Sequence, residues 1–254
     1  MSWRRLPHQL PLVLGHRGAR RQAPENTLQA FDLALDAGAA GVELDVRLER
    51  TGEVIVLHDR TLDRVTEGAD ARDVERCTWS QLAAVDLSRG ERIPRLVDVC
   101  AWARDRRARV NIELKSDVTH PKRLIARTVA LLAHEPTPDR FLLSSFHPGM
   151  VRLALELSDA WISTPVPVAL LVHSRSPHVD ARPTWDGLRA DGIHPAAELV
   201  TPSRLAAWQA RGALVNPWTV NDPDRARELA RLGVDALITD DPAAIVLALQ
   251  AAFH

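Results

Sequence analysis

Short runs of hydrophobic, often β-branched residues alternate with amphipathic stretches along most of the chain. The runs read LVLG, GVELDVRL, EVIVLHD, RVNIELK, FLLSSF, PVPVALLV, ALVNPWTV and VDALITDD, beginning at residues 12, 41, 53, 109, 141, 165, 213 and 234. Runs of this length predict strands, and the amphipathic stretches between them predict helices. Such an alternation indicates parallel β/α units.

The first predicted helix has the most complete set of end signals. Asn26 is expected to cap its N-terminus, and Gly38 is expected to end it. Leu28, Phe31 and Leu35 lie at the spacing of one buried helical face. Further helices are predicted over 96–107, 121–134, 202–211, 223–232 and 242–252.

Eight predicted strands in 254 residues favour one (β/α)8 barrel of the TIM type. Periodicity alone also allows an open doubly wound sheet. EVIVLHD follows VRLERTG too closely for a helix between them, so we expect a short hairpin-like departure near the second strand. No stretch has the composition of an interdomain linker, and residues 1–254 are therefore predicted to form a single α/β domain.

Composition narrows the classes of function. The chain is 46% hydrophobic and 26% charged, with a formal net charge of -1, which argues against a broad cationic surface for nucleic acid. Two cysteines, Cys77 and Cys100, lack the spacing of a zinc site or a disulfide framework. The short N-terminal apolar run, broken by Pro11, predicts neither a signal peptide nor stable membrane insertion. We therefore expect a cytoplasmic protein, whose oligomeric state the sequence leaves open.

Polar residues interrupt two of the predicted strands in a regular way. In GVELDVRL the apolar positions alternate with Glu43, Asp45 and Arg47, so the two carboxylates share one face about 7 Å apart. In NIELK, Glu113 and Lys115 share a face in the same manner. In a barrel the apolar face packs against the helices, so these side chains are predicted to point inward near the carboxyl ends of the strands.

Three inward carboxylates repel one another, at about 4 kcal/mol for each pair at 4 Å and an effective dielectric constant near 20. One compensating arrangement is a salt-bridge network with Arg17, Arg47 and Lys115. The other is a hard divalent cation, Mg²⁺ or Ca²⁺, held by Glu43, Asp45 and Glu113, and three converging acids favour this second arrangement.

Two histidines are predicted to reach the same rim. His16 follows the first strand and His58 ends the run VIVLH, and imidazole exchanges protons near neutral pH. Arg17 offers a guanidinium suited to phosphate oxygens, and Asp59 either orients a ring or binds a neighbouring loop. Together these groups predict a pocket for an anionic ester that undergoes acid–base cleavage.

The ordered set GHRG, PENT, VELDV, VLHD, IELK, SSF, WTVND and ITDDP, spread over residues 15–242, resembles the glycerophosphodiester phosphodiesterase family. The set is specific, although each tetrapeptide alone is weak. The resemblance implies a TIM-type barrel in which one divalent cation is bound by Glu43, Asp45 and Glu113. It also implies that His16 and His58 exchange protons and that Arg17 and Lys115 hold the phosphate of a small-molecule glycerophosphodiester.

The chemistry implied by the resemblance is cleavage to sn-glycerol 3-phosphate and an alcohol. A glycerol hydroxyl attacks phosphorus, the alcohol departs with a proton, and water then opens the cyclic phosphate. We assign His16 as the base and His58 as the acid, although the sequence does not separate these two roles. It also leaves open the leaving alcohol and which of the two cations is used.

Other positions carry two interpretations each. The family match places Phe146 and Trp218 at an apolar wall for the glycerol carbons, whereas aromatic residues at strand ends are more often simply packed. Asp240 and Asp241 either cap the last helix or contact substrate. Four histidines outside the motifs are expected at the surface or the rim: His147, His173, His178 and His194. Residues 173–186 read as a polar loop, expected to contact only the leaving group.

Two alternative functions remain open from the sequence. One is a related barrel phosphodiesterase that acts on lysophospholipids or releases a cyclic phosphate, for which no amphipathic membrane anchor is found. The other is a non-catalytic phosphate-binding barrel, which the complete set of acids and histidines disfavours.

Overall fold

The computed structural model describes residues 3–6, 8–176 and 187–253. Its strands are β1 (Leu12–His16), β2 (Gly41–Leu48), β3 (Val54–Val56), β4 (Arg109–Leu114), β5 (Phe141–Ser145), β6 (Val168–Val172), β7 (Gly192–Pro195), β8 (Leu214–Val215) and β9 (Ala236–Thr239). Most of the predicted loop over 173–186, including His178, lies outside the described residues.

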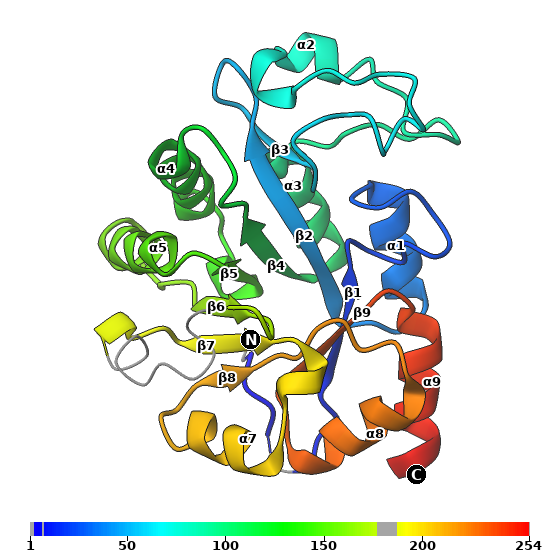
Figure 1. Ribbon diagram of the computed structural model, residues 1–254, viewed down its shortest axis with the longest axis vertical. Helices are drawn as coiled ribbons and strands as arrows, with labels where there is room; N and C mark the ends of the chain where they lie inside the picture. The colour runs from blue at the N-terminus through cyan, green and yellow to red at the C-terminus, as the bar shows by residue number, and fades with distance from the viewer. Residues whose placement is uncertain (1–2, 7, 177–186, 254) are drawn as a thin grey trace.

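The α-helices are α1 (Leu28–Asp36), α2 (Trp79–Leu82), α3 (Leu96–Arg106), α4 (Pro121–Ala133), α5 (Pro148–Trp161), α7 (Pro202–Gln209), α8 (Pro223–Leu232) and α9 (Pro242–Phe253). Three short 3-10 helices are η1 (Val74–Arg76), η2 (Pro138–Arg140) and η3 (Ala197–Leu199). The helices surround the strands, and the segment with η1 and α2 lies beyond the end of β2 (Figure 1). Within the described ranges, none of the helices has the length and apolar character needed to cross a membrane.

Eight parallel strands follow one another in the order β8, β7, β6, β5, β4, β2, β1 and β9. The two ends of this order are also joined by backbone hydrogen bonds. Asp235 N donates to Val215 O at 2.9 Å, and Ile238 N donates to Pro217 O at 3.0 Å. The barrel is therefore nearly closed, and the predicted (β/α)8 architecture is confirmed.

The expected hairpin-like departure is present. β3 pairs antiparallel with β2, with Val46 opposite Val56, and stands outside the barrel order. The predicted set of eight strands was wrong in detail, because it counted β3 and omitted β7. The β7 sequence GIHP has four residues and ends in proline, so it lacks a recognisable strand pattern. Helix α5 was also missed.

The predicted N-cap of α1 was wrong by one residue. Thr27, rather than Asn26, accepts a hydrogen bond from the backbone N–H of Ala30 at its side-chain oxygen. Asn26 takes a left-handed conformation with φ 59° and turns its side chain toward the barrel. Gly38 follows the end of the helix with φ 90°, as expected for a glycine just past a helix terminus.

The barrel interior divides into an apolar floor and a polar mouth. Buried apolar side chains on the floor include Leu14, Leu142 and Ile238, and Trp3 from the N-terminal segment packs against them. On β2 the apolar residues join the layer between strands and helices, so Glu43 and Asp45 face inward as predicted. Polar groups thus gather at the carboxyl ends of the strands, where barrel enzymes place their sites.

The turn after β1 depends on a glycine. Gly18 has φ 85°, and a Cβ there would lie 2.7 Å from backbone atoms of Ala30. Gly68 has the same φ of 85° but has nothing within 4 Å of an added Cβ. We predict that Gly68→Ala costs about 1 kcal/mol of unfolding free energy for its backbone conformation. Gly18→Ala should cost about 2 kcal/mol more because of overlap with α1.

Denaturant unfolding of the two variants checks this comparison. Equal losses of stability in Gly18→Ala and Gly68→Ala would show that contact with α1 does not constrain the turn.

Candidate active site

Glu43, Asp45 and Glu113 converge at the mouth of the barrel. One carboxylate oxygen from each residue lies within 4.8 Å of the other two. The three residues are 5%, 0% and 8% exposed, respectively. The parallel register of β2 and β4 produces this arrangement, because it places Asp45 directly opposite Glu113.

The electrostatics of this cluster reflect strong repulsion. Burial and the neighbouring charges of Asp45 and Glu113 raise the pKa of Glu43 well above its ordinary value. Burial and Asp45 likewise raise the pKa of Glu113. Burial opposes ionisation of Asp45 too, but Lys115 and Arg17 hold its pKa below the ordinary value. The cluster therefore has more carboxylate than its cations neutralise, and its all-oxygen donor set fits a hard divalent cation.

Two cationic side chains lie against the carboxylates. Lys115 Nζ is 2.9 Å from Glu113 Oε1 and 3.4 Å from Asp45 Oδ1, and Arg17 Nε is 3.1 Å from Asp45 Oδ2. Arg17 has φ 57°, a conformation that costs energy for a residue with a side chain and is found at functional sites. The expected network includes Arg17 and Lys115, but Arg47 instead pairs with Asp117 at 2.8 Å.

His16 is held by a carboxylate from the last strand. Its Nδ1 lies 2.6 Å from Asp240 Oδ1. Burial opposes the ionisation of Asp240, but hydrogen bonds from His16 and Asn221 lower its pKa to about 2. Because the carboxylate only accepts, Nδ1 carries the proton and donates it. The other nitrogen, Nε2, lies 3.9 Å from Glu43 Oε2, toward the acidic cluster.

His58 is held in the same way by its neighbour. Its Nδ1 lies 2.6 Å from Asp59 Oδ1, and Arg64 Nε donates to Asp59 Oδ2 at 2.5 Å. Burial, opposed in part by Asp45, lowers the pKa of His58, so its ring is neutral at neutral pH. Each histidine thus presents Nε2 as the nitrogen available for proton exchange.

Glu25, from the PENT motif, joins the two halves of the site. Its side chain is 9% exposed, and its carboxylate receives Arg17 at 2.9 Å, Arg20 at 2.9 Å and Arg64 at 2.6 Å. Arg64 also contacts Asp59, and Arg20 lies 3.8 Å from Asp240. Burial would raise the pKa of Glu25, but the three guanidinium groups hold it below the ordinary value.

The two predicted aromatic residues, Phe146 and Trp218, belong to a cluster of rings. Phe146 packs edge-to-face on Trp218 with ring centroids 5.4 Å apart, and its ring lies 5.6 Å from that of His173. Trp218 Nε1 donates to the carbonyl oxygen of His194 at 2.8 Å. Both predicted aromatic residues therefore lie at the barrel mouth, and His173 lies at the rim as expected.

Sequence reasoning placed His194 wrongly and left Asp240 and Asp241 between two interpretations. His194 is fully buried inside the barrel rather than at the surface or rim, because it lies on the unrecognised strand β7. Its ring nitrogens face Asn216 at 2.9 Å and Asn111 at 3.4 Å, and burial lowers its pKa to about 3. Asp241 caps α9 through Ala244 N, whereas Asp240 turns to His16.

Glu25 and Asn26 were not identified as site residues from the sequence, and Asp240 was left undecided between a helix cap and a substrate contact. Asn26 Nδ2 donates to Asp45 Oδ2 at 3.0 Å, so the end of the PENT motif fixes a carboxylate of the cluster. The available signal was position: Asp240 directly follows a strand, at the same end of the barrel as His16.

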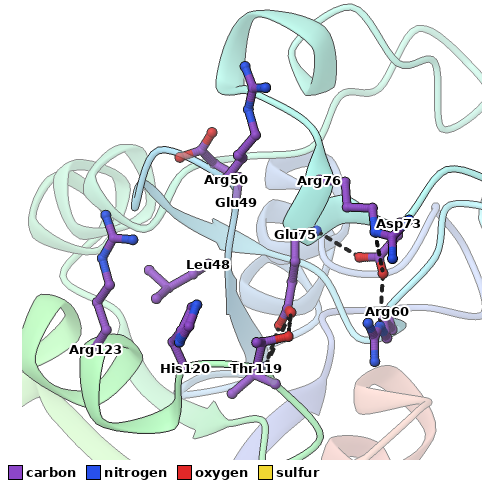
Figure 2. Close-up of a pocket in the computed structure, with 11 residues that line it drawn as sticks. Leu48, Glu49, Arg50, Arg60, Asp73, Glu75, Arg76, Thr119, His120 and Arg123 are labelled. Atoms are coloured by element: carbon purple, nitrogen blue, oxygen red, sulfur yellow. Dashed lines mark hydrogen bonds and ion pairs between the residues drawn. The ribbon is translucent and has the colours of Figure 1, made fainter.

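Two cavities open at this end of the molecule. One, of about 440 Å³, continues from the site on the side of His58, with Glu113 and Lys115 in its wall. The other, of about 360 Å³, lies between the hairpin, η1 and the start of α4. Figure 2 shows two contacts in this second cavity: Glu75 is directed at Thr119, and Arg60 lies beside Asp73.

The sequence model of the glycerophosphoryl diester phosphodiesterase family matches residues 16–244 of this chain. A glycerophosphodiester phosphodiesterase of Caldanaerobacter subterraneus subsp. tengcongensis is 30% identical over 244 residues, which cover 92% of this chain and 96% of that protein.

Solved structures show the same fold. A phosphodiesterase of Oleispira antarctica in complex with the product sn-glycerol-3-phosphate has a TM-score of 0.81 and 26% identity, over 95% of this chain and 97% of that one. A glycerophosphodiester phosphodiesterase from Agrobacterium tumefaciens str. C58 has a TM-score of 0.77 and 27% identity, over 94% of this chain and 100% of that one.

The acidic cluster leads to a prediction about cation binding. We expect Glu43→Ala and Glu113→Ala to lower affinity for Mg²⁺ or Ca²⁺ by at least about 100-fold, because each removes a charged oxygen ligand. Calorimetric titration of metal-stripped protein measures this affinity. Glu135→Gln is the control, since Glu135 is similarly shielded, at 11% exposure, and pairs with Arg104 away from the site. Unchanged affinity in the two Ala variants would mean that the acids are only salt-bridged.

The position of Glu25 leads to a second prediction. Glu25→Gln weakens the hold on Arg17 and Arg64 without a change of side-chain size, and misplaced groups at a catalytic site cost about 10- to 100-fold in kcat/KM. We expect a loss in this range on a phosphodiester substrate, with a melting temperature close to that of Glu135→Gln. In the double variant, Arg64→Ala should add little to the loss of kcat/KM that Glu25→Gln causes alone. Independent, additive effects would contradict a joint role.

Proposed function

This chain belongs to the glycerophosphoryl diester phosphodiesterase family and is a phosphoric diester hydrolase, and we propose that it cleaves glycerophosphodiesters to sn-glycerol 3-phosphate and an alcohol. The solved relative from Oleispira antarctica binds that product, which supports the assignment of the glycerol half of the substrate. We further propose that residues 1–254 act as one catalytic domain.

One observation carries the proposal. Two histidines at the mouth of the barrel are each held through Nδ1 by a separate carboxylate, at 2.6 Å in both cases. Between them lies a buried acidic cluster suited to a cation. Two oriented imidazoles with their Nε2 atoms available are what a reaction with one proton removed and one proton donated requires.

The roles of the histidines follow from this division. His16 accepts the proton of the attacking glycerol hydroxyl, and Asp240 stabilises the imidazolium that forms. His58 donates a proton to the departing alcohol oxygen. Its ring is neutral in the free protein, and the negative charge of a bound diester favours the protonated form that the donor role requires. In the second step the roles reverse, and a water is activated to open the cyclic phosphate.

Arg17 and Lys115 bind the phosphoryl oxygens. Burial lowers the proton affinity of Lys115, but the charges of Glu113 and Asp45 more than compensate and raise its pKa, so it stays cationic. Phe146 and Trp218 exclude water from the carbons of the glycerol moiety.

Glu43, Asp45 and Glu113 are the residues that would hold one divalent cation, Mg²⁺ or Ca²⁺. Such a cation would supply positive charge that stabilises the phosphoryl oxygens as negative charge develops on them. Asn26 and Arg17 orient Asp45 for this purpose.

The test compares a natural diester, glycerophosphoglycerol, with an analogue that lacks the glycerol hydroxyl next to the phosphate ester. Purified protein supplied with Mg²⁺ or Ca²⁺ should release sn-glycerol 3-phosphate from the natural diester. The analogue should react at least about 1,000-fold more slowly, because an internal nucleophile gains a large effective molarity over external water.

Release of products from neither substrate would contradict the proposed activity. Equal turnover of both substrates would retain the hydrolase but replace the internal nucleophile by direct attack of water. A lysophospholipid tested in parallel separates the alternative substrate class considered from the sequence.

A further inference from the structure

The geometry indicates where the leaving alcohol lies. This inference rests on the proposed function, in which His58 donates a proton to the departing oxygen. The cavity of about 440 Å³ begins at His58 and contains Lys115 in its wall. The alcohol half of the diester must therefore extend into this cavity, whereas the glycerol half lies toward His16.

The carboxylates in the wall of this cavity already have cationic partners. Asp59 binds His58 and Arg64. Arg47 donates to both carboxylate oxygens of Asp117 at 2.8 Å. Glu113 binds Lys115 at 2.9 Å. A cationic leaving group would thus meet no free carboxylate in this wall.

The cations in the wall are less completely paired. Arg47 is 1% exposed, donates through Nε to the carbonyl oxygen of His58 at 2.8 Å, and leaves Nη1 without a hydrogen-bond partner. Arg60 also lines the cavity, but it binds Asp73, which is not part of this wall, at 2.9 Å (Figure 2). Arg175 lines the cavity beside Ser176, and within the described ranges its guanidinium forms no ion pair.

Unpaired charge in this wall is therefore positive, and it comes from guanidinium groups. We propose that the cavity is a subsite for a leaving alcohol that carries a carboxylate, with Arg175 as its principal contact. A guanidinium binds a carboxylate through two parallel N–H···O bonds, and the serine hydroxyls of Ser116 and Ser176 supply further donors in the same wall.

The packing of the aromatic rings supports the same choice. Phe146 lines this cavity on the side of Trp218, where the glycerol carbons are proposed to lie, and its ring packs against both Trp218 and His173 rather than forming an open cage. Quaternary ammonium groups are held by open aromatic cages or by carboxylates. Arg175 opposes such a group directly by like-charge repulsion.

Two substrates that differ by one carboxylate provide the test: glycerophosphoserine and glycerophosphoethanolamine. Calorimetry on metal-stripped protein measures affinity for each without turnover. We expect the serine ester to bind about tenfold more tightly at low ionic strength, as one charge-assisted contact at an exposed position allows. Arg175→Ala should reduce this ratio to near one, whereas Arg231→Ala, at the exposed end of α8, should leave it unchanged.

Equal affinities in the unsubstituted protein, a preference for the choline ester, or a ratio that persists in Arg175→Ala would overturn the subsite. Turnover after Mg²⁺ is restored reports separately on the proposed function. If no diester is hydrolysed while the serine ester still binds more tightly, the phosphodiesterase activity fails and the anionic subsite stands. If diesters are hydrolysed without selection for serine, only the subsite fails.

Discussion

Mutual repulsion among Glu43, Asp45 and Glu113 is the constraint on which the rest of the site depends. One carboxylate oxygen from each residue lies within 4.8 Å of the other two in a buried environment. At such distances each ionised pair costs about 4 kcal/mol even with an effective dielectric constant near 20. Lys115 and Arg17 offset part of this cost, yet the pKa values of Glu43 and Glu113 remain raised. The fold thus maintains a local energy cost that a divalent cation would relieve, and such a cost is typical of functional sites rather than of stabilising cores.

The two histidines beside this acidic cluster are positioned by two different kinds of structure. His16 ends a barrel strand, and its partner Asp240 follows the neighbouring strand β9, so the pairing of β1 with β9 fixes both groups. His58 follows the short hairpin strand β3, and its partner is the next residue. The segment around His58 is held by a separate small apolar cluster that includes Leu57 and Leu62. Glu25 connects the two histidine sides of the site. Its carboxylate binds Arg17 and also Arg64, and Arg64 in turn binds Asp59, the partner of His58.

Alternation of strand and helix patterns predicted β/α units, the number of strands favoured the barrel over an open sheet, and alternation within two strands predicted which acids converge. The polar residues within GVELDVRL and NIELK had to share a face, and the parallel register then brought Asp45 opposite Glu113. The same reasoning failed where the pattern was too short: GIHP gave no strand signal, so His194 was placed at the surface although it is buried. Asp240 and Glu25 could not be assigned from the sequence because their roles depend on contacts to residues 224 and 39 positions away, respectively.

The two sides of the site are also expected to tolerate change differently. On the side of His16, every holding group belongs to the barrel or to the turn packed on α1, where Gly18 leaves no space for a side chain. On the side of His58, the cavity wall comes from the ends of β4, β5 and β6 and from the hairpin, and one of its cations, Arg175, is exposed. Substitution of an exposed rim residue changes binding without repacking a core. Substitutions on the glycerol phosphate side are therefore expected to change the stability of the barrel as well as binding. Substitutions at the rim around the departing alcohol are expected to change binding alone.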